Sequence, residues 1–484
     1  MRFIIHKGLL KPTESLDEGL PISKQPICVS QTNPSFAYSK DLQTHLQGRK
    51  LLFDETPFQF EIIHQHYENG YVMYEYGMEK TSKLLRCNRC SNDDISLIGS
   101  FQCARCGENC TYCRSCILMG RVSECTPLIS WIGPEVADQS EFKSMKWDGQ
   151  LSRNQEKGSD QMLGALETKS DLLIWAVCGA GKTEMLFKGI ERALNDNMRV
   201  CIATPRTDVV LELAPRLESV FSQAEIAALY GGSEDRFKRA NLTISTTHQL
   251  LRFEKAFDVM IIDEVDAFPF SADQSLQFAV NRARKEHSSL IYLTATPSEI
   301  LKKSIKNQVK IPQRFHGHHL PVPSFSWCGN YKRSLQKGKL PQSVQDWITS
   351  HLDQEKQAFL FVPSIPVLEE TVAILKKSYP AIVGVHAEDP NRKEKVQGFR
   401  NRDIPIIITT TILERGVTIP NSDVAVLGSE DSVFTESALV QISGRVGRSA
   451  QHPNGDVRFF HYGKTEAMIR AKKHIQMMNE EAKE

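Results

Sequence analysis

The stretch Leu172–Leu186, LLIWAVCGAGKTEML, joins an apolar run to a glycine-rich turn and the start of a helix. Its first six residues have the length and apolar density of a β-strand that is buried on both faces. Gly179 and Gly181 permit backbone angles that side chains forbid, so successive amides of the turn can point at one anion. Apolar residues at helical spacing follow and place a helix N-terminus directly behind the turn. The stretch therefore predicts a phosphate-binding loop, although the strict pattern has Gly where this chain has Ala176.

The residue types of this loop indicate ATP and Mg²⁺ as its ligands. The backbone of Gly179, Ala180 and Gly181 would surround the phosphates. Lys182 would reach the β- and γ-phosphates, and the hydroxyl of Thr183 would hold the magnesium ion. The alternative is a plain glycine turn between a strand and a helix.

The stretch MIIDEVDAF, residues 260–268, supplies a second set of groups for the same chemistry. Most Asp-Glu pairs are solvated surface, but here four apolar residues precede the pair and place it at the end of a buried strand. Asp263 would hold magnesium through water, and Glu264 would orient or deprotonate the attacking water. The two stretches together predict ATP hydrolysis.

Composition limits the architecture more than the function. A chain of 484 residues is long enough for about three domains. Its 59 basic and 58 acidic residues nearly cancel, so any contact with nucleic acid must come from local patches. No apolar run approaches the roughly 20 residues that span a bilayer, and the first residues are not organised as a signal peptide. We therefore expect a cytoplasmic protein.

From residue 172 onward, apolar strand candidates alternate with helical patterns. This alternation predicts parallel sheets with helices on both faces, whose ligands bind at the carboxyl ends of the strands. The pattern occurs twice, so we expect two α/β domains. The expected boundaries are 1–80 for an α+β lead-in, 81–130 for a cysteine-rich zinc module, 150–322 for the first α/β domain and 323–484 for the second.

Seven of the 12 cysteines fall between Cys87 and Cys116, inside the expected zinc module. In a reducing compartment this density favours a metal site over disulfides. Two thiolates two residues apart grip one face of a tetrahedral zinc ion, and a second such pair completes its coordination. The candidates are Cys87 and Cys90 for one pair, Cys103 and Cys106 or Cys113 and Cys116 for the other, and Cys110 in addition. Seven thiols exceed four ligands, so a second ion or spare thiols remain open.

Two basic segments of the chain are candidates for contacts with phosphates. Residues 301–340 carry nine Lys or Arg residues interleaved with four aromatic residues and contain no Asp or Glu. This composition suits single-stranded nucleic acid, where each stacked base contributes about 1–3 kcal/mol; the alternative is a basic connector. In QISGRVGR, Arg445 and Arg448 are three residues apart, so we expect them on one helix face. An arginine that reaches the γ-phosphate from a partner domain can raise the rate by about 10³- to 10⁵-fold.

The motifs together resemble those of superfamily 2 helicases and translocases. In the order of that superfamily they are AVCGAGKT, TPRTD, the Gly231-Gly232 turn, STTHQLL, DEVD, TAT, FLFVPS, TTTILERGVT and QISGRVGR, which resemble motifs I, Ia, Ib, Ic and II to VI. The resemblance implies a helicase core of two RecA-like, doubly wound parallel-sheet domains, preceded here by the small cysteine-rich domain.

A cysteine-rich module ahead of both motor domains, with WAVCGAGKTEM, IIDEVDAFP and TTTILERGV, resembles the ComFA family of late competence ATPases. This resemblance implies an ATP-dependent motor on single-stranded DNA, peripheral at the inner face of the cell membrane. The partners it implies are the ComEC channel, ComFC and DprA, and it leaves room for a homo-oligomer. The zinc motif of the family maps best onto Cys87, Cys90, Cys113 and Cys116.

The resemblance also implies roles for individual residues. Lys182, Thr183, Asp263 and Glu264 would serve ATP binding and hydrolysis, and Arg445 and Arg448 would sense the γ-phosphate. Further nucleotide contacts would come from Gln155, which would read adenine, and from Glu414 and Gln441. The expected DNA-backbone contacts are Pro205, Arg206, Gly232, Thr246, Thr247, Ser364, Thr409 and Thr410.

Two other functions fit the same motifs. One is a DNA helicase of repair or replication restart, although in the primosomal family the zinc module interrupts the motor instead of preceding it. The other is an ATP-gated adaptor whose cysteine module recruits competence proteins.

Overall fold

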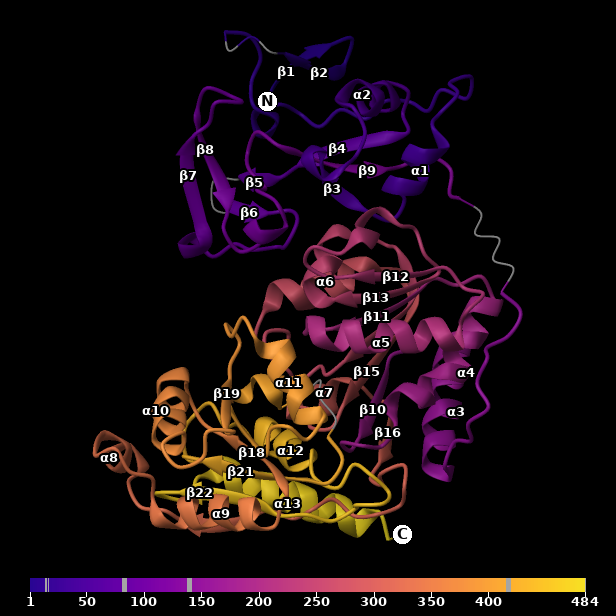
Figure 1. Ribbon diagram of the computed structural model, residues 1–484. Helices are drawn as coiled ribbons and strands as arrows, with labels where there is room; N and C mark the ends of the chain where they lie inside the picture. Colours follow the sequence, from indigo (N-terminus) through magenta and orange to yellow (C-terminus); the bar gives the residue numbers. More distant parts are fainter. Residues whose placement is uncertain (14, 16, 81–84, 137–141, 415–418, 484) are drawn as a thin grey trace. The chain divides into compact units, whose positions relative to one another are not determined.

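The computed structural model describes residues 1–13, 15, 17–80, 85–136, 142–414 and 419–483 (Figure 1). The chain forms two compact units, and each is described by itself. Unit 1 contains residues 1–148, 162–171 and 187–292, and unit 2 contains residues 149–161, 172–186 and 293–484. Residues 415–418 of the TTTILERGVT stretch lie outside the described residues. No described helix is long and apolar enough to cross a membrane.

The N-terminal part of unit 1 is a small α+β fold, as expected for the lead-in. Its three-stranded antiparallel sheet has the order β3-β9-β4, and Tyr67 stacks on Tyr74 in the core with ring centroids 4.1 Å apart. The elements are β1 (Arg2–His6), β2 (Leu9–Thr13), η1 (Ile22–Lys24), α1 (Lys40–Leu46), β3 (Lys50–Leu52), η2 (Phe53–Glu55), α2 (Phe60–Glu68), β4 (Val72–Tyr76) and β9 (Pro127–Trp131). Strand β9 lies within the segment expected for the zinc module, yet it is the central strand of the lead-in sheet.

The cysteine-rich segment is inserted between β4 and β9 and is built from two antiparallel strand pairs. Strand β5 pairs with β6, and β7 pairs with β8 in the register Ile98 opposite Cys113. The elements are β5 (Met78–Lys80), β6 (Leu85–Cys87), η3 (Ile95–Leu97), β7 (Ile98–Gln102), β8 (Asn109–Cys113) and η4 (Ile117–Met119). Because these strands are so short, they bury little apolar surface of their own.

The first large sheet has seven strands among the described residues, in the order β12-β13-β11-β14-β15-β10-β16. The pairs β11·β13, β11·β14, β12·β13 and β10·β16 are parallel, as the alternating pattern predicts. Its strands are β10 (Leu172–Ala176), β11 (Val200–Thr204), β12 (Ile226–Leu229), β13 (Leu242–Thr246), β14 (Phe257–Asp263), β15 (Arg284–Thr294) and β16 (Gln308–Ile311). Its helices are α3 (Arg153–Thr168), α4 (Lys182–Asn195), α5 (Thr207–Val220), η5 (Glu234–Phe237), η6 (Thr247–Arg252), α6 (Gln274–Ala283) and α7 (Glu299–Ser304).

The second large sheet lies in unit 2 and is parallel at every described pair, with the order β17-β22-β21-β18-β20-β19 (Figure 1). Its strands are β17 (Ser324–Trp327), β18 (Gln357–Phe361), β19 (Val383–Val385), β20 (Ile406–Thr409), β21 (Ser422–Leu427) and β22 (Val457–His461). Its helices are α8 (Tyr331–Gln336), α9 (Gln342–Asp353), α10 (Ile365–Leu375), α11 (Arg392–Arg400), η7 (Thr411–Leu413), α12 (Glu436–Ser443) and α13 (Glu466–Glu481).

Alternate residues of β18 show that this sheet is covered on both faces. Leu360 belongs to the apolar cluster that contains Trp347 of α9 and Leu368 of α10. Phe359 points to the opposite face, where its ring centroid lies 4.8 Å from that of Phe399 on α11. Helices on both faces of a parallel sheet define the doubly wound α/β architecture, so the predicted fold class is confirmed.

Candidate nucleotide and metal sites

The predicted phosphate loop in unit 2 has the backbone that anion binding requires. Gly179 and Gly181 have φ angles of +82° and +71°, and the amide of Ala180 donates to the carbonyl of Val177 at 3.1 Å. Helix α4 begins at Lys182, directly after the turn. A Cβ atom at residue 181 would collide with the Gln155 side chain, so this position requires glycine. The loop therefore fits the phosphates of a nucleotide at a helix N-terminus.

Gln155 lies on α3 and packs directly against this loop. Its side chain is 5% exposed, its Nε2 donates to the Gly181 carbonyl at 3.3 Å, and its Oε1 accepts from the Ser152 amide at 2.8 Å. The amide orientation of Gln155 is fixed by these two bonds, because one end donates and the other accepts. A glutamine held at a nucleotide loop agrees with its expected place beside the nucleotide.

Asp263 and Glu264 lie in unit 1, where Asp263 is the last residue of β14. The Asp263 Oδ1 accepts the backbone N–H of Glu264 at 2.9 Å. Glu264 has a φ angle of +58°, in the left-handed region that a residue with a Cβ adopts at a cost of roughly 1–3 kcal/mol. Strain of this kind is held in place where a side chain must point in one direction, so it supports a functional role for Glu264.

The QISGRVGR segment contacts the phosphate loop within unit 2. The thiol of Cys178 donates to Oε1 of Gln441 at 3.0 Å, and both residues are buried. A Cβ atom at residue 444 would clash with Cys178 and would come within 2.7 Å of its Sγ, so only glycine fits at this point. The predicted motif VI is therefore in direct contact with the predicted motif I.

Arg314 makes a second connection between the same two segments. Its guanidinium is buried and donates to the carbonyl of Gly447 at 2.5 Å and to that of Val446 at 2.7 Å. The next residue, Phe315, donates its amide to the Gly179 carbonyl at 3.0 Å. Burial lowers the pKa of Arg314 to about 10, which leaves it charged at neutral pH. No sequence pattern indicated this role, because an arginine in a basic stretch is normally expected to be solvated.

The expectation that Arg445 and Arg448 share a helix face is wrong. Helix α12 ends at Ser443, and Gly444 is its C-cap. Arg445 is 2% exposed with its guanidinium 4.8 Å from the Phe359 ring centroid, whereas Arg448 is half-buried and its Nε donates to the Gly444 carbonyl at 3.1 Å. Two glycines in eight residues weaken the helix enough that it stops before either arginine.

The expected DNA contacts of unit 1 lie at the ends of strands or in turns. Arg206 is the N-cap residue of α5, and Gly232 lies in an exposed turn with a φ angle of +84°. Pro205 is buried directly before Arg206. Thr246 ends β13 and is 6% exposed, and Thr247 begins η6 with no exposed surface. Arg206 and Gly232 are therefore the more accessible members of this set.

Three expected DNA contacts lie in unit 2. Ser364 is the N-cap residue of α10 and makes no side-chain cap bond. The Thr409 side chain is fully buried, and its hydroxyl donates to the Val385 carbonyl at 2.9 Å. Thr410 is half-buried at the end of β20. The Thr409 hydroxyl is therefore already engaged inside the domain, and Thr410 is the more accessible of the two threonines. The buried Glu414 lies at the end of the following turn.

The basic segment 301–340 is folded into elements and is not a connector. Tyr331 is 2% exposed, and Phe325 stacks on Phe459 with ring centroids 6.0 Å apart. Only Phe315 and Trp327 of its four aromatic residues are exposed, at 51% and 68%. The segment contributes β16 and β17 to the two sheets and also forms α8, so its aromatic side chains are divided between buried and exposed positions, and its contact with single-stranded nucleic acid stays a prediction.

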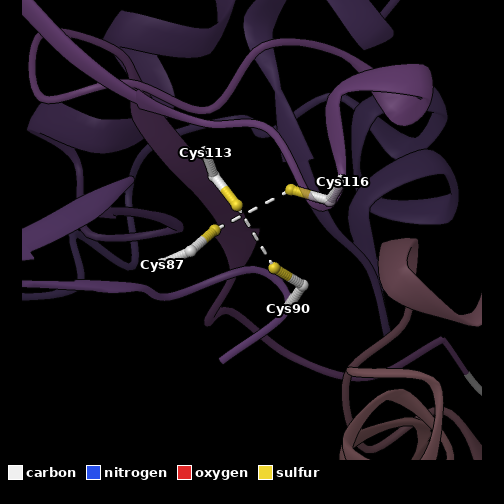
Figure 2. Close-up of side chains that lie close together, drawn as sticks. All are labelled: Cys87, Cys90, Cys113 and Cys116. Atoms are coloured by element: carbon white, nitrogen blue, oxygen red, sulfur yellow. Dashed lines mark hydrogen bonds between the residues drawn. The ribbon is translucent and has the colours of Figure 1, made fainter. Parts of the chain in front are cut away.

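Four of the predicted zinc ligands converge in unit 1. Figure 2 shows the sulfur atoms of Cys87, Cys90, Cys113 and Cys116 pointing toward one another. The Sγ atoms of Cys87 and Cys116 are 3.8 Å apart, and those of Cys90 and Cys113 are 3.6 Å apart. Four thiolates about 2.3 Å from one zinc ion lie about 3.8 Å from each other in a tetrahedron. The four buried thiols therefore fit zinc, and they form the set that the family resemblance implied.

This cysteine site is packed against the first α/β domain within unit 1. Its four cysteines belong to one apolar cluster with Leu250, Phe257 and Leu276 of that domain. Arg282 of α6 donates from Nη1 to the Asn88 carbonyl, which lies between the first two cysteines, at 3.1 Å. The Met119 sulfur after the last cysteine accepts from Nε2 of Gln249 on η6 at 4.0 Å. This cysteine group and η6 thus share a packed interface.

The remaining clustered cysteines form a second group that the sequence did not resolve. Cys103, Cys106 and Cys110 lie together with Cys125, and the ligand atoms of all four lie within 4.8 Å of one another. Cys125 was missed because it belongs to no CxxC pair and lies outside the dense run. The number of cysteines did indicate a second group, because seven clustered cysteines leave three when one tetrahedral site has taken four.

The fold and the two α/β domains define the class of the protein as a helicase-type ATPase. Residues 148–299 match the family model of the type III restriction enzyme res subunit, and residues 339–450 match the helicase conserved C-terminal domain. Among solved structures, the chain is similar to Saccharomyces cerevisiae Dbp5 bound to RNA and ADP BeF3, with 14% identity over 68% of this chain and 91% of that chain, at a TM-score of 0.48. It is also similar to the DUF1998 helicase MrfA bound to DNA, with 14% identity over 69% of this chain and 51% of that chain, at a TM-score of 0.49.

The N-terminal part identifies the family within this class. Residues 30–130 match the competence protein ComFA N-terminal domain. The chain is 53% identical to competence protein ComFA of Bacillus subtilis over 450 residues, which cover 92% of this chain and 96% of that protein. It is 39% identical to ComFA of Streptococcus pneumoniae over 84% of this chain and 93% of that protein. The chain belongs to the ComFA family.

Proposed function

We propose that this ComFA-family protein is an ATPase stimulated by single-stranded DNA that translocates along the strand and drives or assists import of transforming DNA through the competence channel. The observation that carries the proposal is the contact of the QISGRVGR segment with the phosphate loop through Cys178, Gln441 and Arg314. A motor needs its second domain to respond to the nucleotide held by the first, and these contacts are a physical route for that response.

The proposed chemistry at the nucleotide is divided among residues of several motifs. The backbone at Gly179, Ala180 and Gly181 would surround the phosphates, and the Lys182 ammonium would neutralise their charge. ATP with Mg²⁺ supplies the free energy of phosphoryl transfer, and Thr183 and Asp263 would hold the metal.

The proposed proton and charge transfers belong to three further residues. Glu264 would accept a proton from the attacking water, and its left-handed backbone fixes the direction of its carboxylate. Arg445 and Arg448 would stabilise the charge on the γ-phosphate as it leaves. Because Arg445 stacks on Phe359 and Arg448 bonds the Gly444 carbonyl, the two arginines would act in different ways.

Motif III of unit 2 offers a second route between the domains. The Thr296 hydroxyl donates to Oγ of Ser437 on α12 at 2.9 Å, and the Trp175 indole donates to the Ala295 carbonyl at 2.9 Å. Any shift of α12 must therefore move residues next to the strand that leads into the phosphate loop. We infer that this connection transmits nucleotide state to the DNA-contacting strand ends at Ser364 and Thr410.

The DNA contacts, partners and location follow from the family and stay proposals. Contacts from Arg206, Gly232, Ser364 and Thr410 would hold the backbone of the strand without reading its sequence. The proposed partners are the ComEC channel, ComFC and DprA, at the inner face of the membrane. Binding should weaken with salt, with a logarithmic slope near about −0.7 per phosphate contact on single strands.

The test is steady-state ATP hydrolysis by the purified protein, alone and with single-stranded DNA, duplex DNA or RNA. Lys182→Ala is the blank, because it removes the phosphate-neutralising charge but adds no bulk. We expect stimulation by single-stranded DNA alone. Equal rates with and without nucleic acid would rule out the DNA motor.

Two other functions give different outcomes in related assays. Separation of strands at a forked duplex would favour a repair or restart helicase, a reading supported by the 25% identity over 66% of this chain to the transcription-repair-coupling factor of Staphylococcus haemolyticus. This chain covers only 28% of that protein. Restoration of transformation by a Glu264→Gln protein would favour an ATP-gated adaptor, because binding is kept while hydrolysis is lost.

A further inference from the structure

We propose that Cys103, Cys106, Cys110 and Cys125 bind a second zinc ion, separate from the one at Cys87, Cys90, Cys113 and Cys116. The four thiols are 5% exposed or less and form an apolar cluster of their own with Phe101. The Sγ atoms of Cys103 and Cys125 are 3.6 Å apart, close to the value of about 3.8 Å for two thiolates on one tetrahedral zinc ion.

The backbone around Cys103 repeats two hydrogen bonds of the first site. At the first site the Cys87 amide donates to the Asn92 carbonyl at 2.9 Å, and the Ser91 amide donates to the Cys87 carbonyl at 2.8 Å. At the second site the Cys103 amide donates to the carbonyl five residues later at 3.0 Å, and the Gly107 amide donates to the Cys103 carbonyl at 2.8 Å.

A residue with a left-handed backbone conformation follows each of the two CxxC pairs. The φ angle is +63° at Ser91 and +70° at Gly107. The sequences CNRCSN and CARCGE therefore fold into the same turn, which directs two sulfurs and the backbone amides toward one point. Since the first turn supplies half of a zinc site that fits its ion, the second turn is built for the same task.

Strand β8 separates the two sites. Cys110 and Cys113 are three residues apart on β8, and side chains an odd number apart on a strand point to opposite faces. Cys113 thus faces the first group and Cys110 the second. Cys125 reaches the second group because residues 122–124 pair with β8, where the Cys113 amide donates to the Val122 carbonyl and the Glu124 amide to that of Thr111, both at 3.0 Å.

The second site is tied to the start of the chain, whereas the first is packed on the α/β domain. Arg2 donates from Nη1 to the Cys106 carbonyl at 2.7 Å, and its guanidinium lies 3.6 Å from Glu108. Lys24 forms an ion pair with the same glutamate. An ion at this site would hold residues 1–24 against the module, because it fixes the turn whose carbonyl and carboxylate they bind.

Four thiolates leave no open coordination position, so the role of this ion would be structural. Each thiol gives up its proton to solvent when the ion binds, and the ion then links residues 22 positions apart without any redox step. The link that the ion makes between these residues would stabilise a segment that has little apolar core.

The experiment is the zinc content of the purified full chain, measured by elemental analysis and by native mass spectrometry. We expect two zinc ions per chain in the wild type, one in Cys125→Ser, one in Cys116→Ser and none in the double variant. Cys28→Ser is the control, because Cys28 lies in neither group and should keep two ions. One ion in the wild type, with no further loss in Cys125→Ser, would overturn the proposal.

Two measurements on the wild type remain decisive if Cys125→Ser does not fold. A mercurial that displaces thiolate-bound zinc should release two equivalents per chain into a colorimetric zinc indicator. The intact mass of the denatured chain should show all thiols reduced. A mass two hydrogens lower, with a peptide joining Cys103 to Cys125, would show a disulfide in place of the ion and would also overturn the proposal.

Discussion

The Nη2 atom of Arg89 donates to both carboxylate oxygens of Glu55 at 2.7 Å, and Arg89 has no exposed surface. Arg89 lies between two cysteines of the first metal site, and Glu55 ends η2 of the lead-in fold. The same carboxylate also accepts from Nε of Arg252 on η6 at 2.7 Å. Burial alone would raise the pKa of Glu55, but Arg89 and Arg252 outweigh it and hold that pKa below its usual value. One buried carboxylate therefore joins the first cysteine group, the lead-in and η6, which contains most of the STTHQLL motif.

Glu55→Gln should destabilise unit 1, because it leaves two buried arginines without their counter-charge. Breaking a buried ion pair costs about 3–5 kcal/mol. The matched control is Asp54→Asn, since Asp54 pairs with Arg105 at the surface, where such pairs contribute about 0–1 kcal/mol. Urea unfolding followed by tryptophan fluorescence should show a lower midpoint for the first variant only. Equal midpoints would mean that Glu55 does not join the three parts.

His45 should make the protein less stable in mild acid. Burial, reinforced by Arg49 and Arg236, lowers the pKa of His45 to about 4. Below about pH 6.5 the unfolded chain binds a proton that the folded chain does not, so stability is full above that pH and falls toward pH 4. The expected loss between pH 6.5 and 5 is about 2 kcal/mol.

His45→Asn should remove this part of the pH dependence, whereas the exposed His319→Asn should keep it. The measurement is the urea midpoint of each variant at pH 7.5 and pH 5. Parallel curves for the wild type and His45→Asn would contradict the prediction.

Gly444→Ala should uncouple hydrolysis from nucleotide binding. The added Cβ meets Cys178, and such overpacking costs about 1–3 kcal/mol, which corresponds to a loss of about 5- to 150-fold in the population that keeps the contact. ATP hydrolysis should fall while binding of a fluorescent nucleotide is kept, because the phosphate loop is intact. Gly463→Ala is the control, since nothing lies within 4 Å of a Cβ atom there.

A second substitution separates the clash from other causes. Cys178→Ala retains the Cβ atom and should not restore the activity of Gly444→Ala, whereas Cys178→Gly removes that atom and should restore part of it. Equal activity in both double variants would show that the contact between these residues is not the cause.

Thr410→Ala should weaken DNA binding, whereas Thr409→Val should lower the folding stability. Thr410 is half-buried at the strand end, so its loss should weaken binding of a fluorescent single-stranded oligonucleotide with little change in stability. Thr409→Val leaves the Val385 carbonyl without its donor, which costs about 1–3 kcal/mol of folding free energy. Fluorescence anisotropy and thermal unfolding measure the two effects, and the opposite assignment would exclude Thr410 as a DNA contact.

Local patterns were sufficient to predict the parallel sheets and the phosphate loop, because a strand, a glycine turn and a helix are adjacent in the chain. The zinc ligands that lie in CxxC pairs were predictable, because this spacing is visible in the sequence. Cys125 was not, because only the folded pairing of residues 122–124 with β8 brings it to its group.

Features that depend on packing between residues far apart in the chain could not be predicted from the sequence. In the sequence, Arg314 is one of several cations in a basic stretch. In the structure, it is buried against residues more than a hundred positions away in the chain. Gly444 follows the end of α12 at Ser443, and its lack of a side chain leaves room for Cys178, which lies on a distant segment of the chain. The left-handed backbone of Glu264 belongs to a residue type that rarely adopts it.

The order β3-β9-β4 has a consequence for synthesis on the ribosome. The two outer strands emerge first and the central strand last, so neither outer strand has a partner until Trp131 has left the exit tunnel. During that interval the intervening cysteines must fold, and an ion that draws them together shortens the loop that the late strand has to close. Limited metal during translation would therefore expose two unpaired strand edges, and the nascent chain would be most prone to aggregate at that moment.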